Sequence, residues 1–284
     1  MFLMSDSKSR DKNRKSKKTK QDWLERMLLS KGIDERKAKF ICGTKNNVMI
    51  VLYALVLTFT FKTFFYDNFK IPSGSMNPLL LNGDRVLVNK FHYGYTRFSF
   101  PFGLVKFKGR ILSNRTPQRG EIVVFKLPQE EDTDIFYIKR IVGLPGDKIQ
   151  VKKGMLYVND KPATYYEQGV LKAESATNHN AFPSMKYTEV NRNGYSYSVL
   201  VSDPRSLAGN TGEYIVPEGY YFMMGDNRDN SKDSRFGDFG PIPFTHIIGR
   251  AERIFFSTAN GRLNYNRVFA NIQSRYNEEF DSER

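Results

Sequence analysis

The longest apolar run of the chain lies near its beginning. Residues 48–61 read VMIVLYALVLTFTF, Lys62 interrupts the run, and the aromatic residues at 64–66 resume it. A helix that crosses the hydrocarbon core of a bilayer needs about 20 mostly apolar residues, with about 17 as a lower limit. The span 48–66 meets this length if Lys62 extends its amine toward the headgroups, and the aromatic residues suit the interfacial belt. We therefore predict one transmembrane helix over 48–66.

Two other interpretations of this run are weaker. A buried helix of a soluble protein would normally show a polar face, and residues 48–57 show none. A cleaved signal peptide has a shorter apolar region, little sequence ahead of it and a small-residue cleavage site. Here 47 residues precede the run, and no A-x-A follows it. A retained anchor remains the prediction.

Beyond residue 67 the pattern changes to short stretches that alternate or are β-branched. They are 85–89, 121–127, 135–142, 147–151, 155–158, 195–202, 219–224 and 247–256. Turn signals separate them: Asn82-Gly83-Asp84, Pro145-Gly146-Asp147, Asn159-Asp160 and Asn193-Gly194. The predicted fold class is mainly β: an antiparallel β-sheet domain over 67–284, preceded by one transmembrane helix. Residues 160–215 are poorer in apolar runs, which predicts a smaller inserted β lobe bounded at about 153–218.

Charge adds an orientation to this picture. The formal net charge is +14, and residues 8–20 carry eight Lys or Arg against Asp11 alone. Such a tail suits nucleic acid or anionic lipid, but it has no zinc spacing and Trp23 is its lone aromatic neighbour, so no nucleic-acid partner is expected. Because the basic side of a membrane helix stays in the cytoplasm, residues 1–47 are predicted inside and 67–284 outside.

Cysteine and histidine usage limits the chemistry. Cys42 is the one cysteine, so a disulfide within the chain is impossible. The histidines, His92, His179 and His246, show no metal-ligand spacing. We therefore expect no metal and no cofactor.

Residues 91–109 (FHYGYTRFSFPFGLVKFKG) place seven aromatic residues among basic ones. One interpretation is that they form ordinary core strands. The other is an apolar patch that lies on the membrane surface, with lysine and arginine reaching lipid phosphates. The pattern does not choose between them.

Two short stretches could carry chemistry. In 71–78 (IPSGSMNP), two prolines fix the chain and Gly74 permits a tight turn that could present a serine, although a polar linker has the same composition. In 137–147, Lys139 and Arg140 lie inside an apolar, β-prone run. Side chains alternate along a strand, so one of the two must face something unusual, unless the strand lies at an edge that a lysine protects.

A third stretch, 225–235 (GDNRDNSKDSR), contains no apolar residue in eleven positions. A solvated loop explains this composition. A buried network of carboxylate–guanidinium pairs, which would hold a site rigidly, explains it equally well.

In this order behind a membrane anchor, these stretches resemble the signal peptidase I family, the type I leader peptidases of peptidase family S26. The resemblance runs from about 69 to 257, and its matching segments are IPSGSMNP at 71–78, GDRVLVNK at 83–90, RGEIVVF at 119–125, YIKRIVGLPGD at 137–147 and GDNRDNSKDSR at 225–235. It implies an antiparallel β-sheet catalytic domain. It also implies a serine endopeptidase that removes signal peptides from exported precursors at the outer face of the cytoplasmic membrane.

The resemblance also implies roles for individual residues. Ser75 is the nucleophile and Lys139 the general base, while the Ser73 hydroxyl and the Ser75 backbone N–H form the oxyanion hole. Ser231 would hydrogen-bond and orient Lys139. Structural support would come from Gly225 and an ion pair of two loop residues, Asp233 and Arg235. The substrate cleft would be lined by Phe69, Ile71, Pro72, Met76, Tyr137 and Ile138.

The pairing is chemically workable only if Lys139 is neutral. A lysine with a pKa near 10.4 is uncharged in roughly one molecule in 2,500 at neutral pH, whereas burial can lower the pKa by about 3–5 units. The apolar neighbours Ile138, Ile141 and Val142 are consistent with such burial. The expected partners are precursors that bear signal peptides and the phospholipid bilayer. The expected location is the inner membrane, as a single-pass type II protein.

Three rival functions remain at this stage. A self-cleaving repressor-type Ser–Lys peptidase would be soluble, and residues 48–66 argue against it. A pilin-processing peptidase of conjugation systems is excluded less firmly. A membrane-tethered β scaffold that binds export partners would be no enzyme, and loss of precursor cleavage on Ser75→Ala would distinguish the two.

Overall fold

The computed structural model describes residues 23–100, 105, 107–113, 115–174, 181–191, 193–259, 261–272 and 275–276. The chain divides into two compact units, residues 1–60 and 61–284. The basic stretch 8–20 lies outside the described residues.

Two helices precede the β domain: α1 (Trp23–Ser30) and α2 (Glu35–Phe64). Gly32, with φ +78°, ends the first, and the Asp34 carboxylate accepts the backbone N–H of Arg36 at the start of the second. The helix therefore begins 13 residues before the predicted span, because the polar residues 35–47 continue the same helix. It ends two residues earlier than predicted, because Tyr66 already belongs to a strand.

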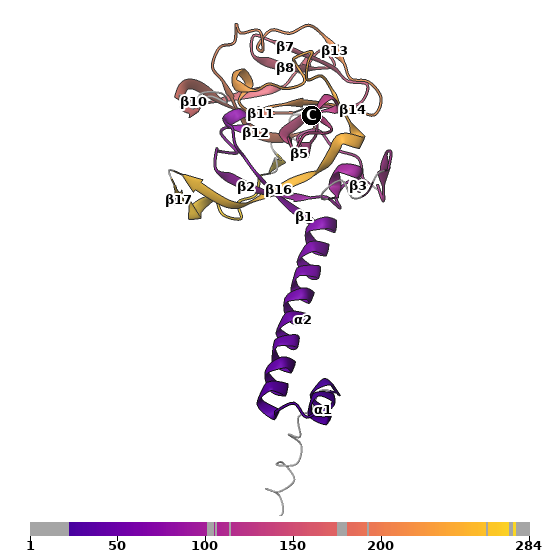
Figure 1. The fold of residues 1–284 in the computed structure, drawn as a ribbon. Coiled ribbons are helices and arrows are strands. Elements are labelled where there is room, and N and C mark those ends of the chain that lie inside the picture. Colours follow the sequence, from indigo (N-terminus) through magenta and orange to yellow (C-terminus); the bar gives the residue numbers. More distant parts are fainter. Residues whose placement is uncertain are drawn as a thin grey trace, which may run out of the picture. The chain divides into compact units, whose positions relative to one another are not determined.

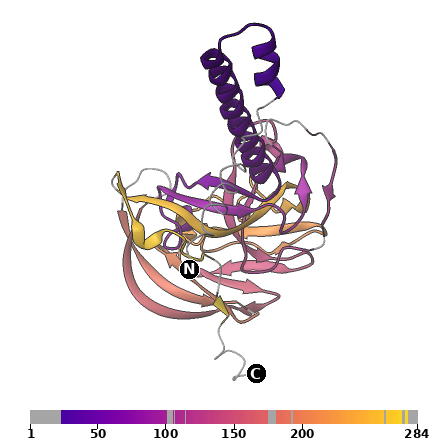
Figure 2. The same cartoon turned by 90° about the horizontal axis from the view of Figure 1, so that it is seen from below.

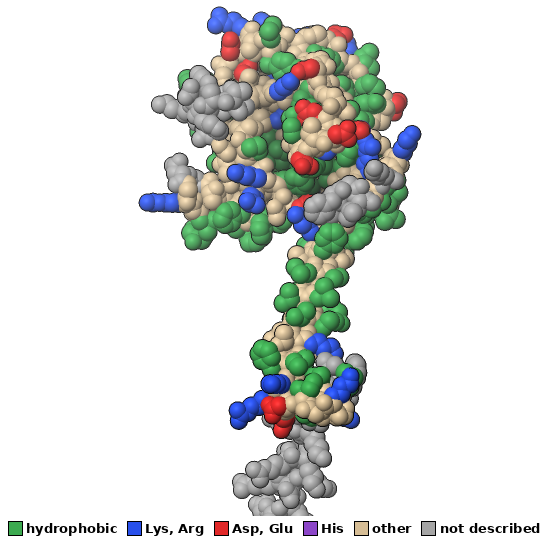
Figure 3. Space-filling view, viewed as in Figure 1, with side chains coloured by type: hydrophobic (Ala, Val, Ile, Leu, Met, Phe, Trp, Pro, Cys, Tyr) green, Lys and Arg blue, Asp and Glu red, His purple; other side chains and the backbone are tan. Residues whose placement is uncertain are grey.

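Among the described residues, α2 is the one helix long and apolar enough to cross a membrane. Its apolar side chains are exposed along its length, with Leu57 71% exposed, and Figure 3 shows hydrophobic groups covering it. Exposed apolar side chains on a helix are costly in water and favourable in lipid.

The β domain is built from strands that are almost all paired antiparallel (Figure 1). The largest sheet has the order β1-β2-β16-β5-β6-β14-β15, with β17 paired to β16. Its strands are β1 (Tyr66–Lys70), β2 (Asp84–Asn89), β5 (Ile122–Phe125), β6 (Tyr137–Gly143), β14 (Tyr220–Met224), β15 (Ile242–Pro243), β16 (Ile247–Ala259) and β17 (Arg262–Leu263). A two-stranded sheet joins β3 (Tyr95–Thr96) to β4 (Arg110–Ile111).

Two four-stranded sheets complete the domain, and Figure 2 shows the long curved strands of one of them. One has the order β10-β11-β12-β18 and the other β13-β7-β8-β9. Their strands are β7 (Lys148–Lys152), β8 (Met155–Val158), β9 (Lys161–Pro162), β10 (Thr164–Glu174), β11 (Ala181–Val190), β12 (Tyr195–Val201), β13 (Tyr214–Ile215) and β18 (Arg275–Tyr276). Most of these strands fall within the predicted lobe 153–218, but residues 61–284 cluster as one compact unit.

All eight predicted stretches contain a strand, and the mainly β, antiparallel fold class is confirmed. The turn signals are used as expected: Gly83, Gly146 and Gly194 have positive φ, as do Asn159 and Asp160. Strands β1, β10 and β11 were not predicted, and neither were the two-residue strands β3, β4, β9, β13, β15, β17 and β18. The hairpin β10–β11 was missed because much of its apolar surface, such as Val170, is exposed. Its sequence therefore lacks a clear alternation of apolar and polar residues.

Strand β5 explains why its sequence reads as a continuous apolar run. Ile122 and Val124 point into one core cluster, whereas Val123 and Phe125 point into a second. A strand buried on both faces shows no polar alternation. Its neighbour β6 is thereby held deep in the fold, with Lys139 opposite Val123 in the register.

Candidate active site around Ser75 and Lys139

Ser75 lies in a buried 3₁₀ turn, η1 (Gly74–Met76), shortly after β1. The loop that follows β14 closes over this turn. Asn227 donates from its side-chain amide to the Gly74 carbonyl at 3.0 Å and from its backbone N–H to the Ser75 carbonyl at 3.1 Å. The polar stretch 225–235 is therefore a buried network against the serine turn and not a solvated loop.

Lys139 Nζ lies 2.5 Å from Ser75 Oγ, a hydrogen-bonded pair between positions 64 residues apart. Both residues are buried, with 4% of Lys139 and 6% of Ser75 exposed. Burial lowers the pKa of Lys139 to about 8, and the charge of Arg235 acts in the same direction. The carboxylates of Asp233 and Asp226 oppose this effect without cancelling it. A hydroxyl beside an amine of this kind can lose its proton to the amine.

Ser73 directly precedes the turn as its N-cap residue. Its Oγ donates to Ser75 Oγ at 3.4 Å, a long hydrogen bond. The Ser73 hydroxyl is therefore close to the atom from which an attack would start, and it is partly exposed.

Gly225 is a steric requirement of this site. A Cβ added to it would overlap Ser231 Oγ and lie 2.5 Å from the Ser75 carbonyl oxygen. Its backbone N–H donates to Asp233 Oδ2 at 2.9 Å. Any side chain at this position would push the loop away from the serine turn.

The expected hydrogen bond between Ser231 and Lys139 is not formed. Ser231 Oγ is buried and meets the geometry of a hydrogen bond with none of the described residues. It lies close enough to Asp233 to help lower the pKa of that carboxyl.

Asp233 and Arg235 form a buried bidentate ion pair. Arg235 donates from Nε to Asp233 Oδ1 and from Nη2 to Oδ2, each at 2.8 Å. It also donates to the Ala208 and Arg228 carbonyls. The guanidinium holds the pKa of Asp233 below its usual range despite burial. The planar fork of arginine fixes the loop in one geometry.

A second ion network behind the site was not predicted. Arg140 donates to Asp226 from Nε at 2.8 Å and from Nη2 at 2.7 Å. Arg228 Nη2 lies 2.7 Å from Glu189 Oε2, and Tyr197 donates to the other oxygen of Glu189 at 2.6 Å. The sequence did mark Arg140 as unusual, because this arginine interrupts an apolar run. The sequence did not mark Glu189, since it lies on the unpredicted strand β11.

The residues expected to line a substrate cleft divide into two groups. Phe69, Tyr137 and Ile138 are half-buried, so each offers some surface. Pro72 is exposed, whereas Ile71 (2% exposed) and Met76 (0% exposed) pack in the core. Ile71 and Met76 belong to one core cluster, and they offer no cleft surface in this structure.

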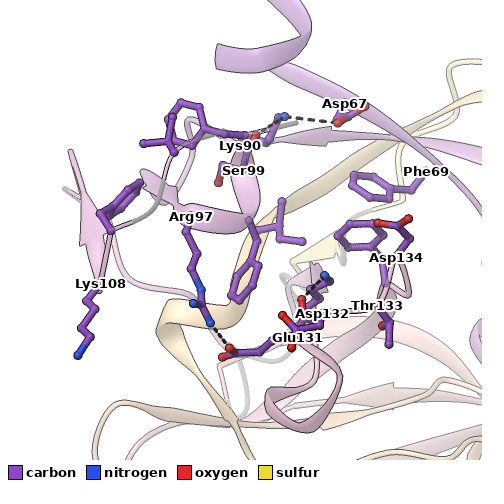
Figure 4. Close-up of a pocket in the computed structure, with 17 residues that line it drawn as sticks. Asp67, Phe69, Lys90, Arg97, Ser99, Lys108, Glu131, Asp132, Thr133 and Asp134 are labelled. Atoms are coloured by element: carbon purple, nitrogen blue, oxygen red, sulfur yellow. Dashed lines mark hydrogen bonds and ion pairs between the residues drawn. The ribbon is translucent and has the colours of Figure 1, made fainter. Parts of the chain in front are cut away.

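The aromatic stretch 91–109 serves two purposes. Tyr93 is fully buried in the core. Phe98, Phe100 and Phe107 line a cavity of about 740 Å³ together with Phe69. Figure 4 shows the cavity and the position of Phe69 beside it. The residues that line this cavity do not include Ser75 or Lys139.

Among the described residues, no group of three or more His, Cys, Asp or Glu side chains could hold a metal ion. His179 lies outside the described residues. His246 Nε2 lies 2.6 Å from Glu131 and His92 Nε2 lies 3.7 Å from Glu121, so both described histidines have a carboxylate neighbour.

Comparison with known proteins gives a consistent result. The sequence model of the family "Signal peptidase, peptidase S26" matches residues 44–256. Two relatives named signal peptidase I, from Rickettsia bellii and Rickettsia typhi, are each 38% identical. The first match covers 75% of this chain and 72% of the relative, and the second covers 72% and 78%.

A crystal structure of a signal peptidase I from Enterococcus faecalis is 25% identical and covers 48% of this chain and 97% of that chain. Its TM-score of 0.28 is too low to bear on the fold. The range matched by the family model includes the serine turn, strand β6 and the polar loop. This chain therefore belongs to the signal peptidase I family of serine peptidases.

Proposed function

We propose that this protein removes signal peptides from exported precursors at a membrane surface, with Ser75 as nucleophile and Lys139 as general base. The observation that carries the proposal is the buried pair itself: Lys139 Nζ lies 2.5 Å from Ser75 Oγ, and burial lowers the pKa of the amine to about 8. Serine needs such a base, because its hydroxyl is a weak nucleophile until its proton is removed.

In the first step the neutral amine of Lys139 accepts the Ser75 proton while Oγ attacks the carbonyl carbon of the scissile bond. The Ser75 N–H and the Ser73 hydroxyl stabilise the negative oxygen of the tetrahedral state. Lys139 then gives its proton to the leaving amine, which leaves an ester on Ser75. Water, deprotonated by Lys139, hydrolyses that ester and restores both residues.

Two free strand edges support a binding mode for the substrate. Among the described residues, β1 pairs with β2 alone, and β14 pairs with β6 only from Arg140 onward. Residues 137–139 therefore keep one edge unpaired beside the active site. An extended peptide can add to such an edge through main-chain hydrogen bonds.

Membrane attachment is the second part of the proposal. Helix α2 is the anchor, with the basic N-terminal side in the cytoplasm and the β domain outside. The β domain also carries exposed aromatic side chains, Phe255, Tyr265 and Phe269. Arg253 donates to the Phe269 carbonyl at 2.9 Å. The Phe255 and Phe269 rings pack 6.2 Å apart, so they form one patch that suits a lipid headgroup region.

Family membership makes the chain a serine hydrolase, which removes the non-enzymatic scaffold as an alternative. Helix α2 argues against a soluble repressor-type peptidase. A pilin-processing activity is distinguished by the substrate, since such an enzyme would not cut ordinary precursors.

The test uses the full chain in detergent with a purified precursor that bears an ordinary signal peptide. Ser75→Ala and Lys139→Met should each abolish cleavage at the signal peptide junction, measured by gel shift and mass spectrometry. Lys161→Met, at an exposed position of β9, is the matched control and should cleave normally. Persistent cleavage by either active-site variant contradicts the dyad, and a wild-type enzyme that spares the precursor contradicts the substrate class.

A further inference from the structure

Strand β12 contacts both partners of the buried ion pair between Arg140 and Asp226. The ring of Tyr197 covers the Arg140 guanidinium, whose central carbon lies 3.9 Å from the ring centroid. Three residues farther along the strand, the backbone N–H of Leu200 donates to the Asp226 carbonyl at 2.8 Å. One strand of the predicted lobe therefore holds both ends of an ion pair whose carboxylate acts on the charge of Lys139.

The hydrogen bonds of Arg140 restrain only the edge of its guanidinium. Nε and Nη2 donate to the two oxygens of Asp226, and Nη1 donates to the Gly120 carbonyl at 2.7 Å. All N–H groups of a guanidinium lie in its plane, so these bonds leave its faces unrestrained. An aromatic ring attracts a buried cation across its face. The Tyr197 ring supplies this contact and keeps the planar fork aligned with Asp226.

The Tyr197 ring is itself held in place through its hydroxyl. Tyr197 Oη donates to one oxygen of Glu189 at 2.6 Å, and Tyr165 Oη donates to the other at 2.5 Å. Arg228 is the counter-charge of the same carboxylate. Burial and the Glu189 carboxylate raise the pKa of Tyr197 well above its usual range. The hydroxyl therefore stays protonated, and the ring stays fixed, over the whole range in which Lys139 titrates.

The ion pair matters because of the charges that act on Lys139. Asp233 and Asp226 both favour the ammonium, and Arg235 opposes it. Asp233 is neutralised within its own loop by Arg235, whereas Asp226 is neutralised by an arginine of β6. If that arginine tilted away, the carboxylate of Asp226 would lose counter-charge in a buried setting and would favour the ammonium more strongly. Tyr197 thus acts on the base through other residues and touches no reacting atom.

We propose that Tyr197 is a positioning residue for the base: its ring keeps the Arg140 guanidinium on Asp226, so that this carboxylate stays neutralised near Lys139. This inference rests on the proposed function and gives the lobe 153–218 a part in it, although the lobe supplies none of the groups in the reaction steps. The role differs from a purely structural one, because its loss changes the pH at which the base becomes neutral.

The pH profile of kcat/KM tests the role of the ring. Tyr197→Leu removes the aromatic face and keeps an apolar side chain, so the apparent pKa of kcat/KM should shift upward by about one unit. With the full chain in detergent and a purified precursor, kcat/KM should be about tenfold below wild type at pH 7 and close to wild type at pH 10, with KM unchanged. Tyr166→Leu, at an exposed position of β10 in the same lobe, is the matched control and should leave the profile unchanged.

Two further ring variants make the test independent of a folding defect in Tyr197→Leu. Tyr197→Phe keeps the ring and removes the donor to Glu189, so it should lower the melting temperature but keep the wild-type pH profile. Pentafluorophenylalanine at position 197 fills nearly the same space as phenylalanine, but its ring face no longer attracts a cation. Its apparent pKa for kcat/KM should therefore lie above that of Tyr197→Phe.

The outcomes separate this inference from the proposed function. A Tyr197→Leu rate that falls by the same factor at every pH, or identical profiles for the phenylalanine and pentafluorophenylalanine variants, overturns the positioning role and leaves the proposed function intact. A wild-type enzyme that spares the precursor, or a Ser75→Ala chain that cuts it, overturns the function itself.

Discussion

The buried amine of Lys139 has two carboxylates near it, and each is engaged by an arginine. Asp233 is held by Arg235 and Asp226 by Arg140, both through two hydrogen bonds. A free carboxylate at either position would favour the ammonium strongly in this low-dielectric setting. Because the carboxylates are engaged, burial remains the dominant effect on the pKa of Lys139, which is lowered to about 8. The ion pairs thus help to keep the pKa of Lys139 low and also fix the shape of the loop.

The first prediction concerns pH. If the neutral form of Lys139 is the base, kcat/KM should rise with pH through about 8, and the neutral fraction grows from about one-tenth at pH 7 to about nine-tenths at pH 9. Initial rates of precursor cleavage between pH 6 and 10 provide the measurement. A rate that falls over this range would show that the ammonium is the active form.

The lowered pKa of Lys139 also affects the stability of the folded protein. The unfolded chain binds the Lys139 proton more tightly than the folded chain does, so this group destabilises the fold below about pH 8. That cost disappears as the pH rises from about 8 toward the ordinary lysine pKa of 10.5.

The second prediction concerns the oxyanion. Ser73→Ala should lower kcat roughly 100- to 1,000-fold without unfolding the protein, because the loss of one such donor typically costs about 2.7–4 kcal/mol of transition-state stabilisation. Ser73→Thr, which keeps the hydroxyl, should restore part of the rate. Thermal melting should be unchanged within about 1 °C in both variants, since Ser73 is partly exposed. Wild-type turnover in Ser73→Ala would remove the residue from this role.

At the scale of elements, the active site depends on strands that lie outside it. Asn227 hydrogen-bonds the loop after β14 to the serine turn. The backbone N–H of Leu200, on β12, donates to the Asp226 carbonyl at 2.8 Å. Glu189, on β11, forms an ion pair with Arg228 of the same loop. The predicted inserted lobe therefore contributes a backbone hydrogen bond and a counter-charge to the loop 225–235.

The third prediction tests this support. Glu189→Gln leaves the buried Arg228 guanidinium without a counter-charge, and breaking a buried ion pair on one side typically costs about 3–5 kcal/mol. Chemical denaturation should show this decrease in the free energy of unfolding. Activity should fall with it as the loop loosens. Glu167→Gln on the exposed face of β10 is the matched control, with a change below about 0.5 kcal/mol. An equal effect of the two changes would contradict the role of Glu189.

At the scale of the whole molecule, the fourth prediction concerns orientation. In a Cys42→Ser background, a cysteine at Leu207 on the β domain should react with a membrane-impermeant maleimide in intact cells. A cysteine at Lys37, on the basic side of the apolar run, should react only after lysis. Both positions are exposed, so access to the reagent depends on the membrane and not on folding. The reverse labelling pattern would contradict the proposed orientation.

Local patterns in the sequence determined the apolar helix, the eight marked strands and the turns with positive φ, because each depends on neighbouring residues and a fixed period. They did not reveal the extension of α2 to Glu35, the β10–β11 hairpin or the burial of Ile71 and Met76, which depend on what packs against these segments. The order of motifs pointed to Ser75 and Lys139. Only the tertiary structure decided that these two side chains, 64 positions apart in the sequence, lie 2.5 Å from each other in a buried site that lowers the pKa of the amine. Contacts between distant positions depend on how the sheet curls and which strands pair, and no local period carries that information.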